Sequence, residues 1–200
     1  MNLDRLLDRL RRRGTAWVAM PAHTVFHDAP LNDHEQQRAS RFRSASDRTA
    51  FVAGRMLIRG ALSDWMNQQT IPLEIDASGK PYCPLPEAPQ FNLSHAAGWV
   101  ALALSTIAPV GIDLEDTRRQ LDPHKLAARY FTPTEQQVLQ SGTPETFFEI
   151  WTRKEAYLKA TGQGLRLPLN HLDTLSLSHT EFKHFKPTPF LLAAIAIIRI

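Results

Sequence analysis

Three helix starts lie within the second half of the chain, and each is a capping residue followed by proline. The pairs are Asp122-Pro123, Thr132-Pro133 and Thr143-Pro144. Asp and Thr side chains accept hydrogen bonds from the first backbone N–H groups of a helix, and proline suits the first helical position because no N–H is needed there. Gly162 is placed to end the third helix in a left-handed conformation. The sequence therefore predicts three successive helices, of which the third is long.

Strand-like segments surround these helices and recur in the first half. In the first half, Asp33 is expected to open a helix with Gln36 in a capping box, and a long helix follows over about residues 47–66. Each half thus combines a mostly antiparallel strand set with one long helix. We predict an α+β protein of two similar lobes, 1–106 and 107–200. The expected strands are 15–20, 98–105, 109–116, 172–178, 182–186 and 190–200.

Composition excludes several classes of protein. No run of about 18 apolar residues occurs, so no transmembrane helix is expected, and the N-terminal segment lacks the apolar core of a signal peptide. Leu3, Leu6, Leu7 and Leu10 instead repeat at helical spacing. The single cysteine, Cys83, excludes an intramolecular disulfide. The net charge of +3 suits anionic partners, but no nucleic-acid motif occurs. We expect a cytoplasmic protein without membrane or nucleic-acid partners.

Two carboxylates share one face of the strand expected at "PVGIDLED", residues 109–116. Asp113 and Glu115 alternate with apolar residues, so the period of two places both acids on one side. Side chains two residues apart on a strand are roughly 7 Å apart, near enough to converge on one ion. Oxygen ligands of this kind favour a hard cation such as Mg²⁺. The competing interpretation is a solvated strand face with two ordinary acids.

Glu155 lies on or beside the apolar stripe of the third helix. Trp151 and Phe148 precede it by four and seven residues. A carboxylate taken out of water needs a charged partner or a metal. Lys159, four residues later, offers a helical pair worth only about 0.2–0.5 kcal/mol. Because that pair leaves the apolar side unexplained, we favour a metal.

Cations and phosphate-binding side chains are spread over the whole chain. Each one alone is more simply explained as a surface residue, although a serine and a histidine at a strand end can both contact a phosphate. The set comprises Arg41, Arg55, Lys80, Ser94, His95, Lys154 and Lys159.

Taken in order, these stretches resemble a known family. "FNLSH", "VGIDLE" and "WTRKEAYLK" are similar to the three signatures of the Sfp-type 4′-phosphopantetheinyl transferases. "RASRFRSASDRTAFVAGRMLIRGAL", "GKPY" and "GQGLRLPL" match further parts of the pattern. The resemblance runs from about residue 35 to residue 170. It implies two lobes related by a pseudo-twofold axis, with the active site between them, for which a monomer suffices.

The resemblance also implies a reaction and the residues for it. The family moves the 4′-phosphopantetheine arm of coenzyme A onto a serine of an acyl or peptidyl carrier protein, using Mg²⁺, and releases 3′,5′-ADP. Asp113, Glu115 and Glu155 would bind Mg²⁺, and the catalytic residues would be Glu155, Lys159 and Asp113. Coenzyme A would be held by Arg41, Arg55, Lys80, Ser94, His95, Lys154 and Lys159.

Some choices stay open at this point. The base for the serine proton is Glu155 or a water on the metal, with Glu135 as the second choice. The carrier is expected to dock on the helix at residues 123–130, where Lys125 and Arg129 share a face, or at the lobe junction. Two other functions compete: a different Mg²⁺-dependent phosphoryl or nucleotidyl transferase, and a non-catalytic module that binds coenzyme A or a carrier protein.

Overall fold

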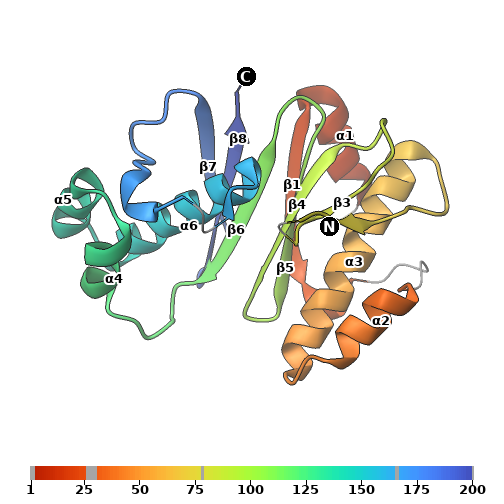
Figure 1. Ribbon diagram of the computed structural model, residues 1–200, viewed down its shortest axis with the longest axis horizontal. Helices are drawn as coiled ribbons and strands as arrows, with labels where there is room; N and C mark the ends of the chain where they lie inside the picture. The colour runs from red at the N-terminus through yellow and green to blue at the C-terminus, as the bar shows by residue number, and fades with distance from the viewer. Residues whose placement is uncertain (1–2, 26–30, 78, 165–166, 200) are drawn as a thin grey trace. The chain divides into compact units, whose positions relative to one another are not determined.

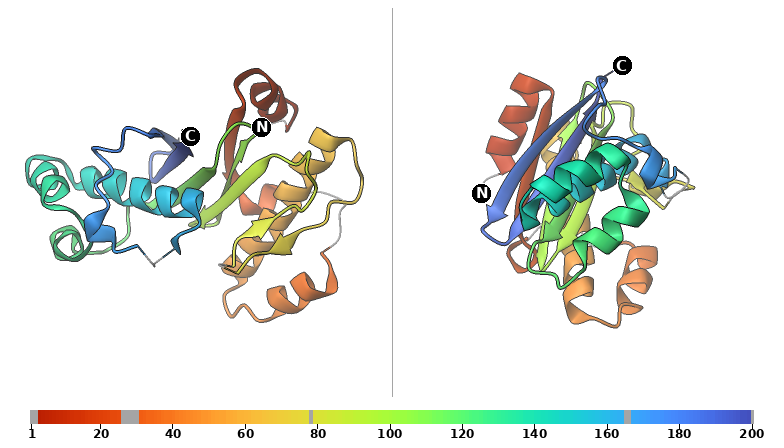
Figure 2. Two further views of the ribbon diagram at one scale, coloured as in Figure 1. Left: turned by 45° about the horizontal axis from the view of Figure 1, so that its top comes forward. Right: turned by 90° about the vertical axis from the view of Figure 1, so that its left-hand side faces the viewer.

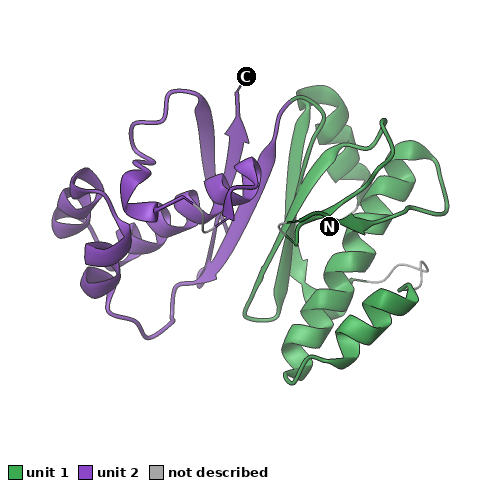
Figure 3. Cartoon of the chain, in the orientation of Figure 1, with its two compact units in different colours: residues 1–107 green, residues 108–200 purple. Residues whose placement is uncertain are grey.

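Each half of the chain builds its own three-stranded antiparallel sheet, and each sheet carries one long helix (Figure 1). The computed structural model describes residues 3–25, 31–77, 79–164 and 167–199. Contacts divide the chain into a first unit, Met1–Ile107, and a second unit, Ala108–Ile200 (Figure 3). The predicted α+β fold class is confirmed. Leu165 and Arg166 of the "GQGLRLPL" motif lie outside the described residues.

The first unit is built on a sheet with the strand order β1-β5-β4. In this sheet Ser105 lies opposite both Thr15 and Gln90. The long helix α3 packs against the sheet, α1 lies along β1, and their apolar residues share one core. The elements are α1 (Leu3–Arg13), β1 (Thr15–Pro21), α2 (Asp33–Ser40), α3 (Ala45–Met66), β2 (Glu74–Ile75), β3 (Pro81–Tyr82), β4 (Gln90–Ala96) and β5 (Trp99–Ser105).

The helices of the first unit start and end for local reasons. Ser44 Oγ accepts a hydrogen bond from Asp47 N at 3.2 Å, so α3 begins two residues before the predicted 47. It ends at Asn67, whose φ of 53° is left-handed. The amphipathic helix predicted at the N-terminus is confirmed as α1, with Leu6, Leu7 and Leu10 buried. Among the described helices, none is long and apolar enough to cross a membrane.

The capping box predicted for α2 is wrong by one residue. Asn32, not Asp33, caps the helix: its Oδ1 accepts from Glu35 N at 2.8 Å, and Glu35 Oε2 accepts from Asn32 N at 3.1 Å. Glu35 Oε2 also accepts a hydrogen bond from Arg59 of α3 at 2.7 Å. This contact with a neighbouring helix favours the cap at Asn32, one residue before the predicted cap.

The second unit repeats the plan with the strand order β6-β8-β7. Figure 2 shows α6 against this sheet, and α4 and α5 pack against α6 in turn. All three predicted helix starts are confirmed, and Gly162 ends α6 with a φ of 67°. The elements are β6 (Val110–Asp116), α4 (Pro123–Tyr130), α5 (Pro133–Ser141), α6 (Pro144–Thr161), β7 (Thr180–Thr188) and β8 (Leu191–Ile198).

The strand predicted at residues 172–178 is wrong, because this segment is a series of turns. Leu172 is buried with Leu158 and Leu169, so its apolar side chain has a place in a core without belonging to a sheet. Thr174 N and Oγ1 donate hydrogen bonds to Glu135 Oε1 at 3.0 and 2.8 Å. Side chains of the helices therefore satisfy the polar groups that a strand would pair with its neighbours.

Gly111 allows α6 to lie directly on β6. A Cβ atom at this position would lie 2.0 Å from the carbonyl oxygen of Ala156 and 2.5 Å from the backbone nitrogen of Ala160. Ala194 and Ala196 of β8 are buried beside the same two helix residues. Small residues on both surfaces thus bring the helix backbone close to the sheet.

We predict that Gly111→Ala lowers the free energy of unfolding by about 2–3 kcal/mol or more, since the added methyl group meets backbone that cannot move alone. Urea denaturation followed by circular dichroism measures this loss. The matched control is Gly54→Ala in α3, where the Cβ would meet only the end of the Leu93 side chain, which can rotate. Equal losses in the two variants would contradict this account of Gly111.

Candidate active site

β6 places two carboxylates on the side that faces α6. Asp113 and Glu115 lie on the same side of the strand as Gly111, because side chains alternate along it. Asp113 is only 5% exposed, and the side chain of Glu115 is 13% exposed. The apolar residues of β6 are buried on the other side. The competing interpretation of a solvated acidic face is therefore excluded.

Lys159 links α6 to β6 through Asp113. Its Nζ donates a hydrogen bond to Asp113 Oδ1 at 2.7 Å. The lysine side chain is 30% exposed and the aspartate side chain 7% exposed, so solvent reaches the pair from the lysine end. The lysine therefore does more than pair with Glu155 one turn earlier on its own helix.

Glu115 is held from two directions. Trp151 of α6 donates its indole N–H to Glu115 Oε1 at 3.1 Å. Arg119, in the segment after β6, donates to Glu115 Oε2 at 2.5 Å. Burial and the charge of Asp113 raise the pKa of Glu115, and the contacts with Arg119 and Trp151 oppose that rise. The two donors thus stabilise a carboxylate that its surroundings otherwise disfavour.

Glu155 faces the same group of acids from α6. Burial raises the pKa of Glu155 above its ordinary value, the negative charge of Asp113 raises it further, Lys159 opposes the rise, and Glu115 adds to it. All three carboxylates are therefore close enough to repel one another. Such repulsion is relieved when a proton or a cation is bound.

The donors at this site suit a hard cation, although the side chains are turned toward protein partners. Among the described residues, no three Asp, Glu, His or Cys side chains are gathered as a metal-binding group. Instead, Asp113 contacts Lys159, and Glu115 contacts Trp151 and Arg119. Three carboxylates that repel one another nevertheless supply the oxygen ligands that Mg²⁺ takes. The residue types and their mutual charge fit the metal.

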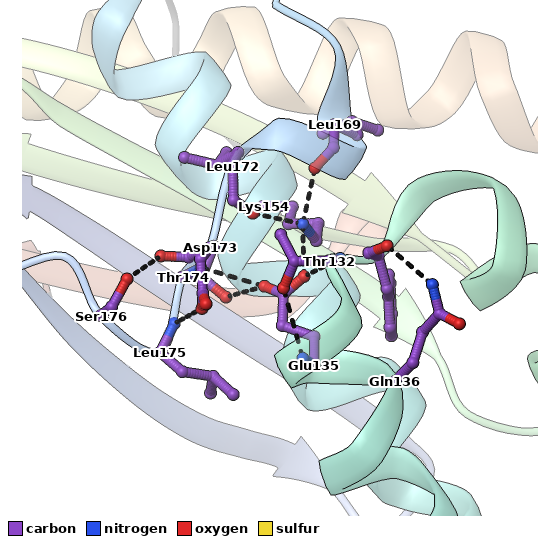
Figure 4. Close-up of polar contacts among 11 residues, drawn as sticks. Thr132, Glu135, Gln136, Lys154, Leu169, Leu172, Asp173, Thr174, Leu175 and Ser176 are labelled. Atoms are coloured by element: carbon purple, nitrogen blue, oxygen red, sulfur yellow. Dashed lines mark hydrogen bonds and ion pairs between the residues drawn. The ribbon is translucent and has the colours of Figure 1, made fainter.

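Next to Glu155 on α6, Lys154 is completely buried and serves a different purpose. Its Nζ forms an ion pair with Glu135 Oε2 at 2.6 Å and donates to the carbonyl oxygens of Leu169 and Leu172 (Figure 4). Both side chains of the pair are 0% exposed. The second carboxylate oxygen of Glu135 binds Thr174. This network joins α5 and α6 to the turns that follow.

Buried charge also lies in the first unit, around Glu35 of α2. Arg59 Nη2 lies 2.7 Å from Glu35 Oε2, and Arg55 Nε lies 3.3 Å from Glu35 Oε1. Arg55 and Arg59, both on α3, are each 6% exposed. Burial lowers the pKa of Arg55, Glu35 opposes this, and Arg38 and Arg59 lower it further. One carboxylate thus holds two guanidinium groups in the interior.

The other predicted ligands of coenzyme A lie on separate elements of the first unit. Arg41 is exposed directly after α2, and His95 is exposed near the end of β4, next to the buried Ser94. Lys80 follows the turn between β2 and β3, where its backbone N–H donates to Asp76 Oδ1 at 2.9 Å. Burial lowers the pKa of Lys80, and Asp76 opposes that effect.

Comparison with known proteins assigns the family. The profile of the 4′-phosphopantetheinyl transferase superfamily matches residues 109–194, and that of the N-terminal part of 4′-phosphopantetheinyl transferase matches residues 15–107. A 4′-phosphopantetheinyl transferase of Bacillus subtilis is 31% identical over 169 residues, covering 76% of this chain and 74% of that protein. The chain belongs to the Sfp-type 4′-phosphopantetheinyl transferases.

Two further relatives agree with this assignment. The 4′-phosphopantetheinyl transferase HetI of Nostoc sp. is 37% identical over 146 residues, which cover 68% of this chain and 62% of HetI. The 4′-phosphopantetheinyl transferase gsp of Aneurinibacillus migulanus is 33% identical over 151 residues, which cover 72% of this chain and 62% of gsp. The chain thus spans a little less than two thirds of these two relatives.

The structure does not support the catalytic or coenzyme A-binding roles that the sequence predicted for three residues. Lys154 cannot reach a phosphate without leaving a buried ion pair. Glu135 is the other member of that pair and is equally buried, so its position does not suit the role of base. Arg55 is held in the interior at Glu35. The structure does bring Asp113, Glu155 and Lys159 together.

Sequence reasoning missed residues that orient this site. The helical spacing places Trp151 in an apolar stripe, but its indole N–H binds Glu115, 36 residues away. The one available signal is its position four residues before Glu155, which places both side chains on one side of α6. Arg119 follows Glu115 by four residues and lies beyond the end of β6. Outside a helix, this spacing does not predict a contact.

We predict that Lys154→Met lowers the free energy of unfolding by about 3–5 kcal/mol, because it leaves Glu135 charged and buried without its cation. Chemical denaturation measures the loss. Lys186→Met removes a comparable but exposed pair with Glu145 and is expected to cost about 1 kcal/mol or less. A loss no larger for Lys154→Met than for this control would refute the structural role.

Proposed function

We propose that this chain transfers the 4′-phosphopantetheine arm of coenzyme A to a serine of an acyl or peptidyl carrier protein and releases 3′,5′-ADP. The observation that carries the proposal is the group formed by Asp113 and Glu115 of β6 with Glu155 and Lys159 of α6, in a chain of this family. In the reaction, the serine oxygen forms a bond to phosphorus, and the bond from that phosphorus to the oxygen of the leaving 3′,5′-ADP breaks.

Asp113, Glu115 and Glu155 would together hold Mg²⁺. A bound Mg²⁺ supplies positive charge to the pyrophosphate of coenzyme A and orients it. The repulsion among the three carboxylates supports this role, since a divalent cation relieves it.

Lys159 is suited to neutralise charge on the phosphoryl group that is transferred. Its side chain is partly exposed and pairs with Asp113, so a substrate phosphate would compete with Asp113 for its Nζ. The proton of the serine hydroxyl would pass to Glu155 or to a water on the metal. Arg41, Lys80, Ser94 and His95 are the proposed contacts for the phosphates of coenzyme A.

The decisive experiment mixes the protein with coenzyme A, Mg²⁺ and a panel of apo carrier proteins, and measures the intact mass of each carrier. A mass increase equal to one phosphopantetheine arm on a carrier serine, abolished by EDTA, is expected. A protein that binds coenzyme A but leaves every carrier unmodified would instead be a binding module.

We predict that Glu155→Gln reduces transfer by about 100-fold or more and at the same time raises the free energy of unfolding of the metal-free protein by about 0.5–1 kcal/mol. The second effect follows because the variant removes one of three repelling charges. Transfer assays and urea denaturation in EDTA measure the two effects.

Glu145→Gln is the matched control for Glu155→Gln, since Glu145 lies at the start of the same helix and its exposed side chain pairs with Lys186. It is expected to change neither quantity appreciably. If Glu155→Gln transferred normally, or destabilised the metal-free protein, Glu155 would not belong to a repelling metal site.

Charge on α4 gives a prediction for carrier docking. Lys125 and Arg129 are exposed, whereas Leu126, Tyr130 and Phe131 belong to a buried cluster, so the surface offers charge and little apolar area. We predict that the double variant Lys125→Glu/Arg129→Glu raises the carrier KM about tenfold at low salt and leaves coenzyme A binding unchanged. Steady-state transfer at low and moderate salt measures this, and an unaltered carrier KM would place docking elsewhere.

A further inference from the structure

Helix α1 lies outside the part of the chain that the family profiles match, which begins at residue 15. Its leucines are buried in the core of the first unit, so the helix is an integral part of that unit. The polar side of α1 carries five arginines and two aspartates, a net formal charge of +3. The whole chain also has a formal net charge of +3. The charge excess of the protein is therefore concentrated on one short helix.

A half-open groove with a volume of about 700 Å³ lies between this helix and β1. Four guanidinium groups and one carboxylate line it, and Trp17 of β1 forms part of its wall. Ala16 and Val18 belong to the core, so the indole of Trp17 projects from the other side of the strand. Small-molecule sites commonly have volumes of about 300–1,000 Å³. The charged residues of the lining are Arg5, Asp8, Arg9, Arg12 and Arg13.

Two arginines of this groove, Arg9 and Arg13, interact with each other, and Arg9 also lies over Trp17. The guanidinium carbon of Arg9 lies 3.6 Å from the ring centre of Trp17, which fixes that side chain over the indole. Burial lowers the pKa of Arg9, and the like charge of Arg13 lowers it further. Arg12 forms an ion pair with Asp8. The like charges of Arg9 and Arg13 thus repel each other beside the groove, and a bound anion would relieve that repulsion.

We propose that the groove between α1 and β1 binds a small ligand with two or more phosphate groups. The planar fork of a guanidinium matches the oxygens of a phosphate, and several forks around one space favour a multiply charged ligand. Arg5 and Arg13 are separated by about 12 Å along the helix axis, at 1.5 Å per residue. That length accommodates a di- or triphosphate, whereas a nucleic acid would need a longer basic surface than this helix offers.

The test uses inorganic pyrophosphate as the probe and the full-length protein saturated with coenzyme A in EDTA, so that the site of the proposed transfer is already filled. Isothermal titration calorimetry should detect one bound pyrophosphate. The double variant Arg9→Gln/Arg13→Gln should bind it about tenfold or more weakly, since it loses charge-assisted hydrogen bonds. Arg13→Gln alone changes one exposed side chain and serves as a second variant should the double variant fail to fold.

Arg11→Gln is the matched control, because Arg11 lies over Trp65 and does not line the groove. It removes the same charge from the same helix and should change pyrophosphate affinity by about twofold or less. Equal weakening by Arg11→Gln and by the groove variants, or failure of the unaltered protein to bind pyrophosphate, would overturn the proposal.

Two further measurements distinguish the groove from a lipid-binding surface and from the site of transfer. Binding to vesicles containing a phosphoinositide, without binding of pyrophosphate, would overturn the assignment to a soluble ligand. Carrier modification should proceed at the normal rate in the groove variants, so a failure of the phosphate site is distinguishable from a failure of the transferase proposal.

Discussion

The close packing of α6 on β6 decides where every acidic residue of the candidate site lies. Gly111 leaves no side chain between the strand and the helix backbone. Asp113 and Glu115, the next two residues on the same side of the strand, therefore also contact α6. On the helix, Glu155 and Lys159 are one turn apart and reach the same region. A larger residue at Gly111 would move all these groups apart together.

The neighbours Lys154 and Glu155 show how one helix serves two purposes. Successive residues of an α-helix point about 100° apart. Lys154 therefore enters the interior toward Glu135 and the turns after η3 (Leu169–His171), whereas Glu155 faces β6. The buried pair of Lys154 and Glu135 fixes the rotation of α6 about its axis, and Gly111 fixes the distance of the helix from the sheet. Together these contacts set the position of α6 and, with it, the positions of Glu155 and Lys159.

The sequence predicted those features that depend on neighbouring residues. Capping residues followed by proline identified three helix starts, and the alternation in β6 placed Asp113 and Glu115 on one side. Features that depend on distant residues were missed. Arg59, 24 residues from Glu35, explains why Asn32 caps α2, and Glu135, 39 residues from Thr174, accounts for the turns where a strand was expected. Hydrophobic periodicity cannot reveal such contacts, because the predicted and the observed structure of each segment satisfy the same pattern.

Burial and pairing distinguish the cations that serve the fold from those available to a ligand. A cation that serves the fold meets a carboxylate or carbonyl groups in the interior, as Lys154 does at Glu135 and Arg59 does at Glu35. These pairs are costly to break, since each leaves a charge buried. The proposed metal site shows a different arrangement: beside the pairs with Lys159 and Arg119, the carboxylates Asp113, Glu115 and Glu155 also repel one another. This repulsion among neighbouring acids, which no sequence motif contains, supports the proposal that the chemistry takes place at β6 and α6.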